Sequence, residues 1–449
     1  MAFLFTIIYI VLAVLSPDYV LPALAPYHLQ VGIAVLAICA SVPIALQKNI
    51  LMAPQSVFLA VIIAGMVPSF VVMGWYGGAV QALDKFIPSA AVFYLVLVNC
   101  RKIRRLRTVA LAACLIAVYL VIMGAIAYGT RDPNSPWLFT EKLDSGVFLM
   151  RMRAFGFLND PNDLAQYLLT ITPFLWLMWR DRRTVRNFLL VIVPAGIILV
   201  GVFLTHSRGG LVGFAALLVF AFKDRLGPVK SSILAALGFA GLMVLNITGG
   251  RSVSMQGGAD RLELWSYALE SFRSSPLFGV GFQQFSETHR NAVHNTFLNC
   301  AVELGLFGYL FWMGLLVFSF SDLGAVLELE RGRATAVAAG AGDQGGSLTA
   351  HATDGEEDSR AMVPQLQRFA YLVRIAFVGY LATGFFLSRT YTLSLFVLLG
   401  MAAAVRRTAA DAGLLPPTTV TLRLMRRTAF LAVASLGVIY AIVRLHWMR

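Results

Sequence analysis

The sequence RKIRRLRTVALAACLIAVYLVIMGAIAY at residues 101–128 decides the fold. Its first part is densely basic, and the remainder, from residue 108 onward, contains no charged residue. An apolar run of about 20 residues is long enough to cross the roughly 30 Å hydrocarbon core of a bilayer as a helix. Because Lys and Arg accumulate on the cytoplasmic side of membrane spans, we expect this helix to begin inside the cell.

The same pattern recurs along the 449-residue chain, of which 58% is hydrophobic and 13% is charged. A soluble globular chain carries about 25% charged residues. The sequence therefore predicts an all-α polytopic membrane protein with about 12 transmembrane helices, or 13 if every short run crosses, and a large, partly helical loop outside. The apolar runs fall at 2–16, 29–47, 56–74, 86–100, 108–128, 163–179, 187–205, 209–222, 231–247, 295–320, 368–387, 391–405 and 428–445.

The net charge of +13 follows the same topology. Most basic residues lie in short clusters between apolar runs, which predicts cytoplasmic loops rather than a nucleic-acid-binding surface. These clusters are 101–107, 180–186, 223–230 and 406–427. Counting crossings from them places four other segments outside, namely 129–162, 206–209, 249–294 and 388–390.

Two arginines, Arg151 and Arg153, lie outside according to this count, just before an apolar run. They oppose the positive-inside bias, and a cation at this height suits an anionic headgroup or a phosphate near the membrane surface. The following Asp160-Pro161-Asn162-Asp163 is typical of a helix start, with Asn162 or Asp163 as the capping residue. Capping is thus the structural alternative to a functional role for Asn162.

A short turn, Thr205-His206-Ser207-Arg208-Gly209-Gly210, joins two apolar runs at the outer interface. Two interpretations of Arg208 remain open. Its side chain could reach to lipid headgroups, or a guanidinium held in a cavity could offer a forked donor to a phosphate. The two glycines allow close approach of the backbone or simply turn the chain.

The longest polar interruption runs from Gly249 to Gly308. The apolar spacing within 261–272 predicts an amphipathic helix near the membrane interface. We expect Arg261 to lie in the first turn of this helix, where the helix dipole disfavours a cation, which hints at an anion to bind. Gly279-Val280-Gly281 predicts a tight turn, and it is not a nucleotide-binding loop because no βαβ pattern surrounds it.

His294 comes directly before an apolar run, and His289 and Arg290 lie in the same outward loop. A neutral imidazole near a hydroxyl acceptor suits a general base, whereas a helix cap is the structural alternative. No third ligand stands nearby at metal spacing, so we expect no metal and no cofactor. Glu303 falls inside the next span, where lipid exposure would be costly, and we expect it to pair with Arg374.

Between Arg153 and Gly314 the sequence resembles the O-antigen ligase and O-antigen polymerase-like superfamily of bacterial membrane glycosyltransferases. The order of the motifs and their placement on outward loops carry this resemblance. The motifs are Gly156-Phe157-Leu158-Asn159-Asp160-Pro161-Asn162, Ser207-Arg208-Gly209-Gly210, Arg261 with Trp265, Pro276-Leu277-Phe278-Gly279-Val280-Gly281, His294-Asn295 and Glu303-Leu304-Gly305.

The resemblance implies a multi-pass protein of the bacterial inner membrane with its active site at the periplasmic face. Together with the apolar runs and the composition, it predicts four regions: N-terminal transmembrane helices in 1–150, an O-antigen ligase-related core in 151–320 with a periplasmic loop at 248–294, a cytoplasmic linker at 321–365, and C-terminal transmembrane helices in 366–449. The middle of the linker, 334–359, lacks a hydrophobic period and is predicted to be disordered.

The resemblance also implies a metal-independent, inverting glycosyltransferase. Its donor would be a glycan on undecaprenyl diphosphate, and its acceptor a lipid A–core sugar in a ligase or a lipid-linked glycan in a polymerase. A diphosphate leaving group needs cations around it, so Arg208 and Arg261 are predicted to bind the diphosphate, with Arg153 as a third candidate. His294 would take the proton of the acceptor hydroxyl. The secondary candidates are Asn162, His289 and Arg290.

Two alternatives contain no chemistry. One is a multi-spanning transporter of a lipid-linked glycan or polysaccharide, but transporters often show related halves with broken spans near the midplane, and no such pairing is visible here. The other is an oligomeric membrane scaffold, which would not explain outward arginines. The sequence does not distinguish a ligase from a polymerase.

Overall fold

The computed structural model describes residues 1–47, 50–72, 74–143, 146–244, 256–289, 291–329 and 354–447. Arg290 and the start of the predicted polar interruption, residues 249–255, lie outside these ranges, as do residues 334–353 of the expected linker.

Helices dominate the described chain, in the order that the sequence predicts. The N-terminal elements are α1 (Ala2–Leu15), α2 (Pro17–Val20), η1 (Pro22–Tyr27), α3 (Leu29–Ala45), η2 (Ile50–Met52), α4 (Pro54–Val72), α5 (Tyr76–Asn99) and α6 (Ile103–Thr130). The middle elements are β1 (Leu138–Lys142), β2 (Phe148–Met152), η3 (Gly156–Leu158), α7 (Pro161–Ile171), η4 (Thr172–Met178), α8 (Thr184–Asn187), η5 (Phe188–Ile192), α9 (Val193–Leu204), α10 (Arg208–Val244), α11 (Gln256–Ser274), α12 (Gln284–His289) and α13 (Thr296–Leu327). The C-terminal elements are α15 (Asp354–Gly384), α16 (Leu393–Asp411) and α17 (Leu422–Trp447).

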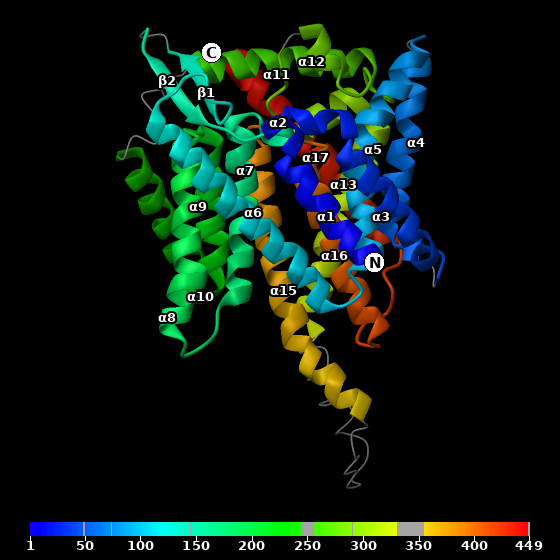
Figure 1. Ribbon diagram of the computed structural model, residues 1–449. Coiled ribbons are helices and arrows are strands. Elements are labelled where there is room, and N and C mark those ends of the chain that lie inside the picture. The colour runs from blue at the N-terminus through cyan, green and yellow to red at the C-terminus, as the bar shows by residue number, and fades with distance from the viewer. Residues whose placement is uncertain are drawn as a thin grey trace.

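The long helices run between two ends of a bundle (Figure 1). One end carries β1, β2, α11 and α12 and is called the loop end here. The opposite end, where α8 and the start of α15 lie, is called the basic end.

Nine of the described helices are long and apolar enough to cross a bilayer. They confirm the predicted class, an α-helical polytopic membrane protein. The count of about 12 or 13 spans stays a prediction, because the apolar runs 2–16, 163–179 and 368–387 lie on helices outside these nine.

The element α10 is a hairpin of two helices rather than one long helix. Its chain turns at Gly227, whose φ of 79° lies in the left-handed region that glycine adopts at little cost. Leu211 and Leu242, near its two ends, belong to one apolar cluster. A Cβ on Gly238 would lie 3.0 Å from Cδ1 of Leu218, so the two halves pack antiparallel. The two short apolar runs, 209–222 and 231–247, are therefore the two arms of this hairpin.

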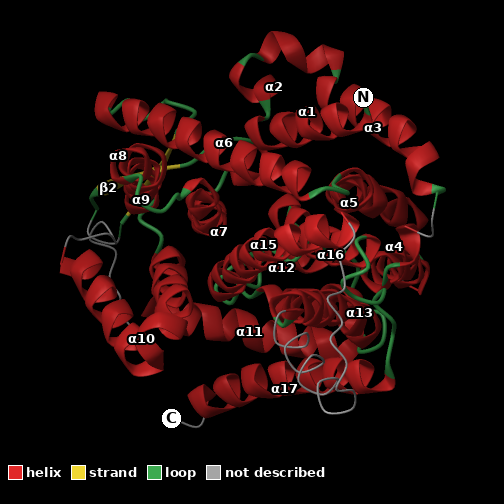
Figure 2. Ribbon diagram, turned by 90° about the horizontal axis from the view of Figure 1, so that it is seen from below, coloured by secondary structure: helices red, strands yellow, loops and turns green. Residues whose placement is uncertain are grey.

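The centre of the bundle is formed by α13, α15 and α16, whereas α3, α10 and α17 lie at the rim (Figure 2). Over its most apolar stretch α16 is 89% buried, while the segment Pro22–Ala45, which contains α3, is only 11% buried. Apolar side chains such as Val229 and Leu237 on α10 are exposed. Exposed apolar side chains at the rim are expected in a membrane protein, because they contact lipid rather than water.

A two-stranded antiparallel hairpin stands in the segment between α6 and α7, where no strand was predicted. The register of β1 and β2 runs from Leu138 opposite Met152 to Lys142 opposite Phe148. Strands this short give little sequence signal, because their alternation extends over too few residues.

At the basic end, arginines from three elements cap one helix terminus. Arg107 of α6, Arg186 of α8 and Arg368 of α15 donate to backbone carbonyls where η4 ends. Carbonyls at a helix C-terminus lack intrahelical donors and carry partial negative charge, so cations stabilise them. The acceptors are the carbonyls of Trp176, Leu177, Met178 and Trp179.

Candidate functional site

Three helix N-termini meet at the loop end: α7 begins at Pro161, α10 at Arg208 and α13 at Thr296. Ser207 and Asn162, at two of these starts, share a hydrogen bond of 2.8 Å. A helix N-terminus presents the positive end of the helix dipole. Their convergence makes this end of the bundle suited to an anion.

The start of α7 is capped by Asp160, whose carboxylate accepts the backbone N–H of Asn162 at 2.7 Å. The prediction that Asn162 or Asp163 caps the helix is therefore wrong. Pro161 takes the first helical position, which needs no N–H, and the residue before it becomes the cap. The side chain of Asn162 is used elsewhere, because its Oδ1 accepts hydrogen bonds from Ser207 and Arg151.

Arg208 is the first residue of α10, and its surroundings hold that helix start in place. The hydroxyl of Ser207 accepts the backbone N–H of Gly210 at 3.1 Å, which caps the helix. A Cβ on Gly210 would lie 3.3 Å from Cβ of Ala165 on α7. The glycine pair thus lets α10 begin tightly against α7, and Arg208 is half-buried beside it.

Arg151 is bound within the protein and is not available to a headgroup. Its side chain is 3% exposed, and it donates to the carbonyl of Thr205 at 2.9 Å, to Glu141 at 3.0 Å and to Oδ1 of Asn162 at 3.0 Å. The interpretation of Arg151 as a lipid or phosphate ligand is therefore wrong. It ties the β1–β2 hairpin to the starts of α7 and α10.

Arg153 lies two residues farther on, where the hairpin ends. Its Nε donates to the carbonyl of Pro136 at 3.2 Å, and its backbone N–H donates to the carbonyl of Trp137 at 2.9 Å. These bonds hold it at the base of the hairpin, and its role as a third phosphate-binding residue stays a prediction.

His294 precedes α13 and has a left-handed backbone with φ of 55°. Asn295 caps the helix, since its Oδ1 accepts the backbone N–H groups of Phe297 and Leu298, both at 3.0 Å. The backbone N–H of His294 itself donates to Oγ of Ser388 at 2.7 Å. Asn295, and not His294, therefore caps α13, so the structural alternative considered for His294 does not apply to its imidazole.

The pKa of His294 is lowered, first by burial and next by the positive charge of Arg261. Arg389 lowers this pKa further, while Asp160 opposes the shift. Burial disfavours the charged imidazolium, and neighbouring cations do the same. The imidazole is therefore held neutral near neutral pH, which is the form that accepts a proton.

The amphipathic helix predicted at 261–272 is present as part of α11, which lies across the loop end (Figure 1). It begins at Gln256, so Arg261 lies in the second turn, and the expectation of a first-turn cation is wrong. The sequence before residue 261 has no apolar period, which hid the true start. Trp265 is 4% exposed and packs with Ala268 in an apolar cluster that includes Ile439 of α17.

Arg389 is a candidate site residue that sequence reasoning missed. It lies in the turn between α15 and α16, forms an ion pair with Asp163 of α7, and remains 38% exposed at its side chain. Its backbone N–H donates to Oγ1 of Thr296 at 3.1 Å. The available signal was an arginine in a very short outward turn, the same signal that singled out Arg208.

A backbone seam explains the glycines of two motifs. The N–H groups of Val280 and Gly281 donate to carbonyls of α13 at 2.9 and 3.0 Å, and those of Leu306 and Phe307 donate back to the Pro276–Leu277 segment at 2.8 and 3.1 Å. Gly305 interrupts α13 with φ of 63°. A Cβ on Gly279 would lie 2.5 Å from the carbonyl of Glu303, so only glycine fits. The seam fixes the loop that leads to α12 and His294.

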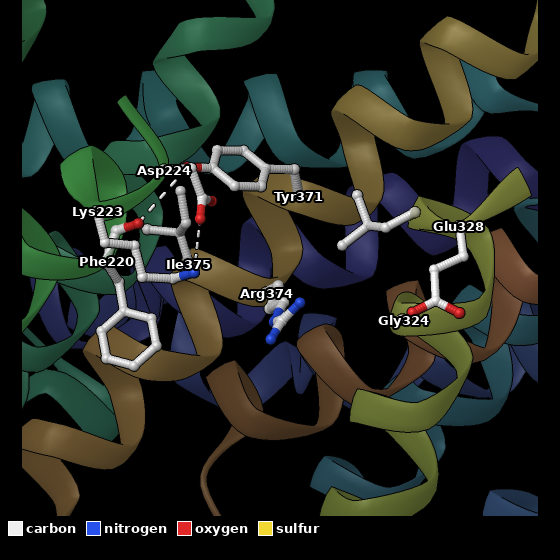
Figure 3. Close-up of a pocket in the computed structure, with 9 residues that line it drawn as sticks. Phe220, Lys223, Asp224, Gly324, Glu328, Tyr371, Arg374 and Ile375 are labelled. Atoms are coloured by element: carbon white, nitrogen blue, oxygen red, sulfur yellow. Dashed lines mark hydrogen bonds and ion pairs between the residues drawn. The ribbon is translucent and has the colours of Figure 1, made fainter. Parts of the chain in front are cut away.

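The expected pair of Glu303 and Arg374 does not form. Glu303 is 2% exposed and lies at the seam, whereas Arg374 lines a cavity of about 320 Å³ that also includes Lys223 and Glu328 (Figure 3). Figure 3 shows Arg374 between α10 and α13, with Lys223 and Asp224 on one wall and Glu328 on the other. The two residues thus lie at different heights along the bundle. The sequence alone does not show at what height in the membrane a charged residue lies.

His289 lies on α12 and is not joined to His294 by any described contact. Its Nδ1 is 3.1 Å from the carbonyl of Phe285, and its ring stacks on that phenyl ring with centroids 4.2 Å apart. Within the described ranges, no group of three or more His, Cys, Asp or Glu side chains is placed to hold a metal ion. Arg290 lies outside the described residues.

Taken with the apolar helices, this arrangement defines a polytopic membrane protein with basic side chains gathered where three helix N-termini meet. Residues 193–313 match the family described as O-Antigen ligase. The chain therefore carries a domain of the O-antigen ligase superfamily, a family of membrane enzymes, and the resemblance found in the sequence is confirmed. No curated protein matches the chain in a sequence search.

The matched region runs from α9 into α13 and contains Arg208, Arg261 and His294. Arg153 and Asn162 lie before it, and Arg389 lies after it. The three residues predicted to do most of the chemistry are thus those inside the family domain.

Proposed function

We propose that the protein is a metal-independent, inverting glycosyltransferase of the bacterial inner membrane. It transfers a glycan from undecaprenyl diphosphate to a sugar hydroxyl at the periplasmic face. The acceptor is a lipid A–core sugar or another lipid-linked glycan. The reaction requires a site for a diphosphate beside a base, and it requires both at the membrane surface that the lipid-linked substrates reach.

The convergence of cations and a half-buried imidazole at the loop end supports this function most directly. Arg208 stands at a helix N-terminus, and Arg261 and Arg389 are near enough to His294 to lower the pKa of its imidazole. The basic clusters that the positive-inside rule assigns to the cytoplasm meet at the other end, where Arg107 and Arg186 cap the same helix terminus. This opposition favours a periplasmic loop end.

The arrangement accounts for each bond change in such a transfer. The acceptor oxygen attacks the anomeric carbon while His294 takes the hydroxyl proton. The bond from that carbon to the diphosphate oxygen breaks, and the electron pair leaves with the diphosphate. Arg208 and Arg261 stabilise the charge that the leaving group gains, because fixed cations act strongly in a site that excludes water. One displacement from the opposite face inverts the anomeric configuration.

Deleting the gene and analysing surface glycans tests the proposal and separates its two forms. A ligase predicts loss of long glycan from lipid A–core together with accumulation of lipid-linked polymer. A polymerase predicts glycans that stop at a single repeat unit. An unchanged glycan profile would contradict both forms.

The site assignment has its own test in the deletion strain. His294→Ala and Arg208→Ala should abolish transfer, since removing a general base costs about 10²–10⁴-fold in rate, while the amount of protein in the membrane stays unchanged. A transporter without chemistry would not need the base. Wild-type glycan in cells that carry His294→Ala would therefore favour transport over transfer.

A further inference from the structure

The peptide group between Val293 and His294 is bound at both of its polar atoms. Its carbonyl oxygen accepts the indole N–H of Trp265 at 3.0 Å, and its N–H donates to Oγ of Ser388 at 2.7 Å. Trp265 belongs to α11, and Ser388 to the turn between α15 and α16. Two regions that lie far apart in sequence thus fix one peptide plane.

This peptide needs external support because of its backbone conformation. His294 has φ of 55°, a region that side chains with a Cβ adopt only at a cost of about 1–2 kcal/mol. Such conformations persist where the surrounding structure over-determines them, and they concentrate at functional sites. The next residue, Asn295, caps α13, so its backbone cannot change to relieve the strain at His294.

Each of the two supporting residues is itself held rigidly. Trp265 is 4% exposed, and its ring meets that of Phe385 edge to face with centroids 5.7 Å apart. The turn that carries Ser388 is closed by Thr296, whose hydroxyl donates to the carbonyl of Leu387 at 2.6 Å and accepts the N–H of Arg389 at 3.1 Å. Movement of either support would therefore disturb the packed loop end.

We propose that Trp265 and Ser388 are positioning residues, which hold His294 in its left-handed conformation and so direct its imidazole toward the acceptor hydroxyl. The inference rests on the proposed function, in which His294 is the base. Arg261 precedes Trp265 by one helical turn and lies on the same face of α11. The helix therefore fixes the orientation of the base and the position of one diphosphate ligand together.

The charges around the imidazole give this arrangement a measurable consequence. The groups that act on His294 are Arg261 from α11, Asp160 from the start of α7 and Arg389 from the turn. Since burial is the largest cause of its lowered pKa, an imidazole that is released into water should regain a pKa closer to that of an ordinary histidine.

Two variants each remove one of the hydrogen bonds. Ser388→Ala deletes the hydroxyl, and Trp265→Phe deletes the indole N–H while keeping an aromatic ring in the apolar cluster. Ser388→Thr restores a hydroxyl and should rescue the loss caused by Ser388→Ala. Ser266→Ala is the matched control, because that hydroxyl donates to the carbonyl of Glu263 on the same helix and does not reach His294.

The first readout is the transfer rate of the purified full-length protein with lipid-diphosphate-linked glycan extracted from the host membrane. We expect kcat to fall about 10–100-fold in Ser388→Ala and Trp265→Phe with KM nearly unchanged, because the base is misdirected while the diphosphate ligands remain. Wild-type kcat in both variants would overturn the proposal, as would a failure of Ser388→Thr to recover activity.

The second readout needs no substrate. Diethyl pyrocarbonate modifies neutral imidazoles, and mass spectrometry follows His294 and His289 separately as pH is varied. Both variants should accelerate modification of His294 and shift its pH midpoint upward, while His289 stays unchanged. An unaltered His294 profile would refute the positioning role even if activity fell. Full transfer by His294→Ala would instead sink the proposed base, which distinguishes the two failures.

Discussion

Arginines gather at both ends of this bundle, and those of the basic end and Arg208 of the loop end lie at opposite kinds of helix terminus. At the basic end Arg107, Arg186 and Arg368 donate to carbonyls where η4 terminates, which satisfies both the carbonyls and the helix dipole. At the loop end Arg208 begins a helix, where the dipole opposes a cation. The diphosphate of the proposed donor would offset this unfavourable field. The comparison thus contrasts arginines that cap a helix C-terminus with Arg208, which we propose binds the diphosphate.

The largest effect expected from this comparison concerns transfer activity. Arg208→Ala should reduce kcat by about 10²–10³-fold, because one fixed donor to the developing charge is lost. Arg186→Ala removes an arginine of the basic end and should leave kcat unchanged within about twofold. Both are measured with lipid-linked donor after correction for the amount of folded protein.

The Arg208→Lys variant sharpens the same test. Lysine keeps the charge but lacks the planar fork that binds two phosphate oxygens. We expect an activity between those of the wild type and Arg208→Ala. Equal loss in Arg186→Ala and Arg208→Ala would mean that the two ends do not differ in function.

Glycines provide a second contrast between the ends, measured as stability. Gly279 at the seam has φ of 73°, and a Cβ there would lie 2.5 Å from the backbone of Glu303. Gly413, between α16 and α17, has a similar φ of 68° but no atom within 4 Å of such a Cβ. Gly413→Ala should cost only the strain of a left-handed alanine, about 1–2 kcal/mol.

Gly279→Ala adds a steric clash to that strain, so the seam must open. We expect a much lower midpoint of thermal unfolding in detergent than for Gly413→Ala, together with loss of transfer. If both variants unfold at the same temperature, the close approach of the two backbones is not what holds the seam.

The fold class could be predicted from the sequence because long uncharged runs and basic clusters are properties of consecutive residues. The amphipathic helix within 261–272 was recoverable for the same reason. Contacts between residues that lie far apart in the sequence could not be predicted. The contacts of Arg151 with Thr205, Glu141 and Asn162, which belong to three separate segments, could not be deduced from its neighbours in the sequence.

The candidate site likewise contains residues that the sequence predicted and residues that it did not. Motif order suggested His294, Arg208 and Arg261, and the structure places Arg261 near enough to His294 to lower the pKa of its imidazole. Arg389 lies outside the motifs, and its relation to His294 depends on the packing of α15 and α16 against α13. The expected pair of Glu303 and Arg374 rested only on their opposite charges. In the structure α13 breaks at Gly305, and Glu303, just before the break, lies at the seam.

The smallest expected effect concerns Arg389, whose positive charge helps to lower the pKa of His294. Removing Arg389 alone would leave the buried Asp163 unpaired, which is strongly destabilising. We therefore choose the double variant Asp163→Asn with Arg389→Gln, which removes both charges of the ion pair. Losing the cation stabilises the imidazolium, so the pKa of His294 should rise.

A base works only above its pKa, so the acid limb of transfer activity should move to higher pH in this double variant, while activity well above the limb changes little. The pH profile of His294 modification checks the same shift without substrate. Arg273→Gln, which removes a cation of α11 that stacks over Tyr440, is the control and should leave both profiles in place. A shift of the same size in the control would mean that net charge, rather than the position of Arg389 beside His294, sets the protonation of the base.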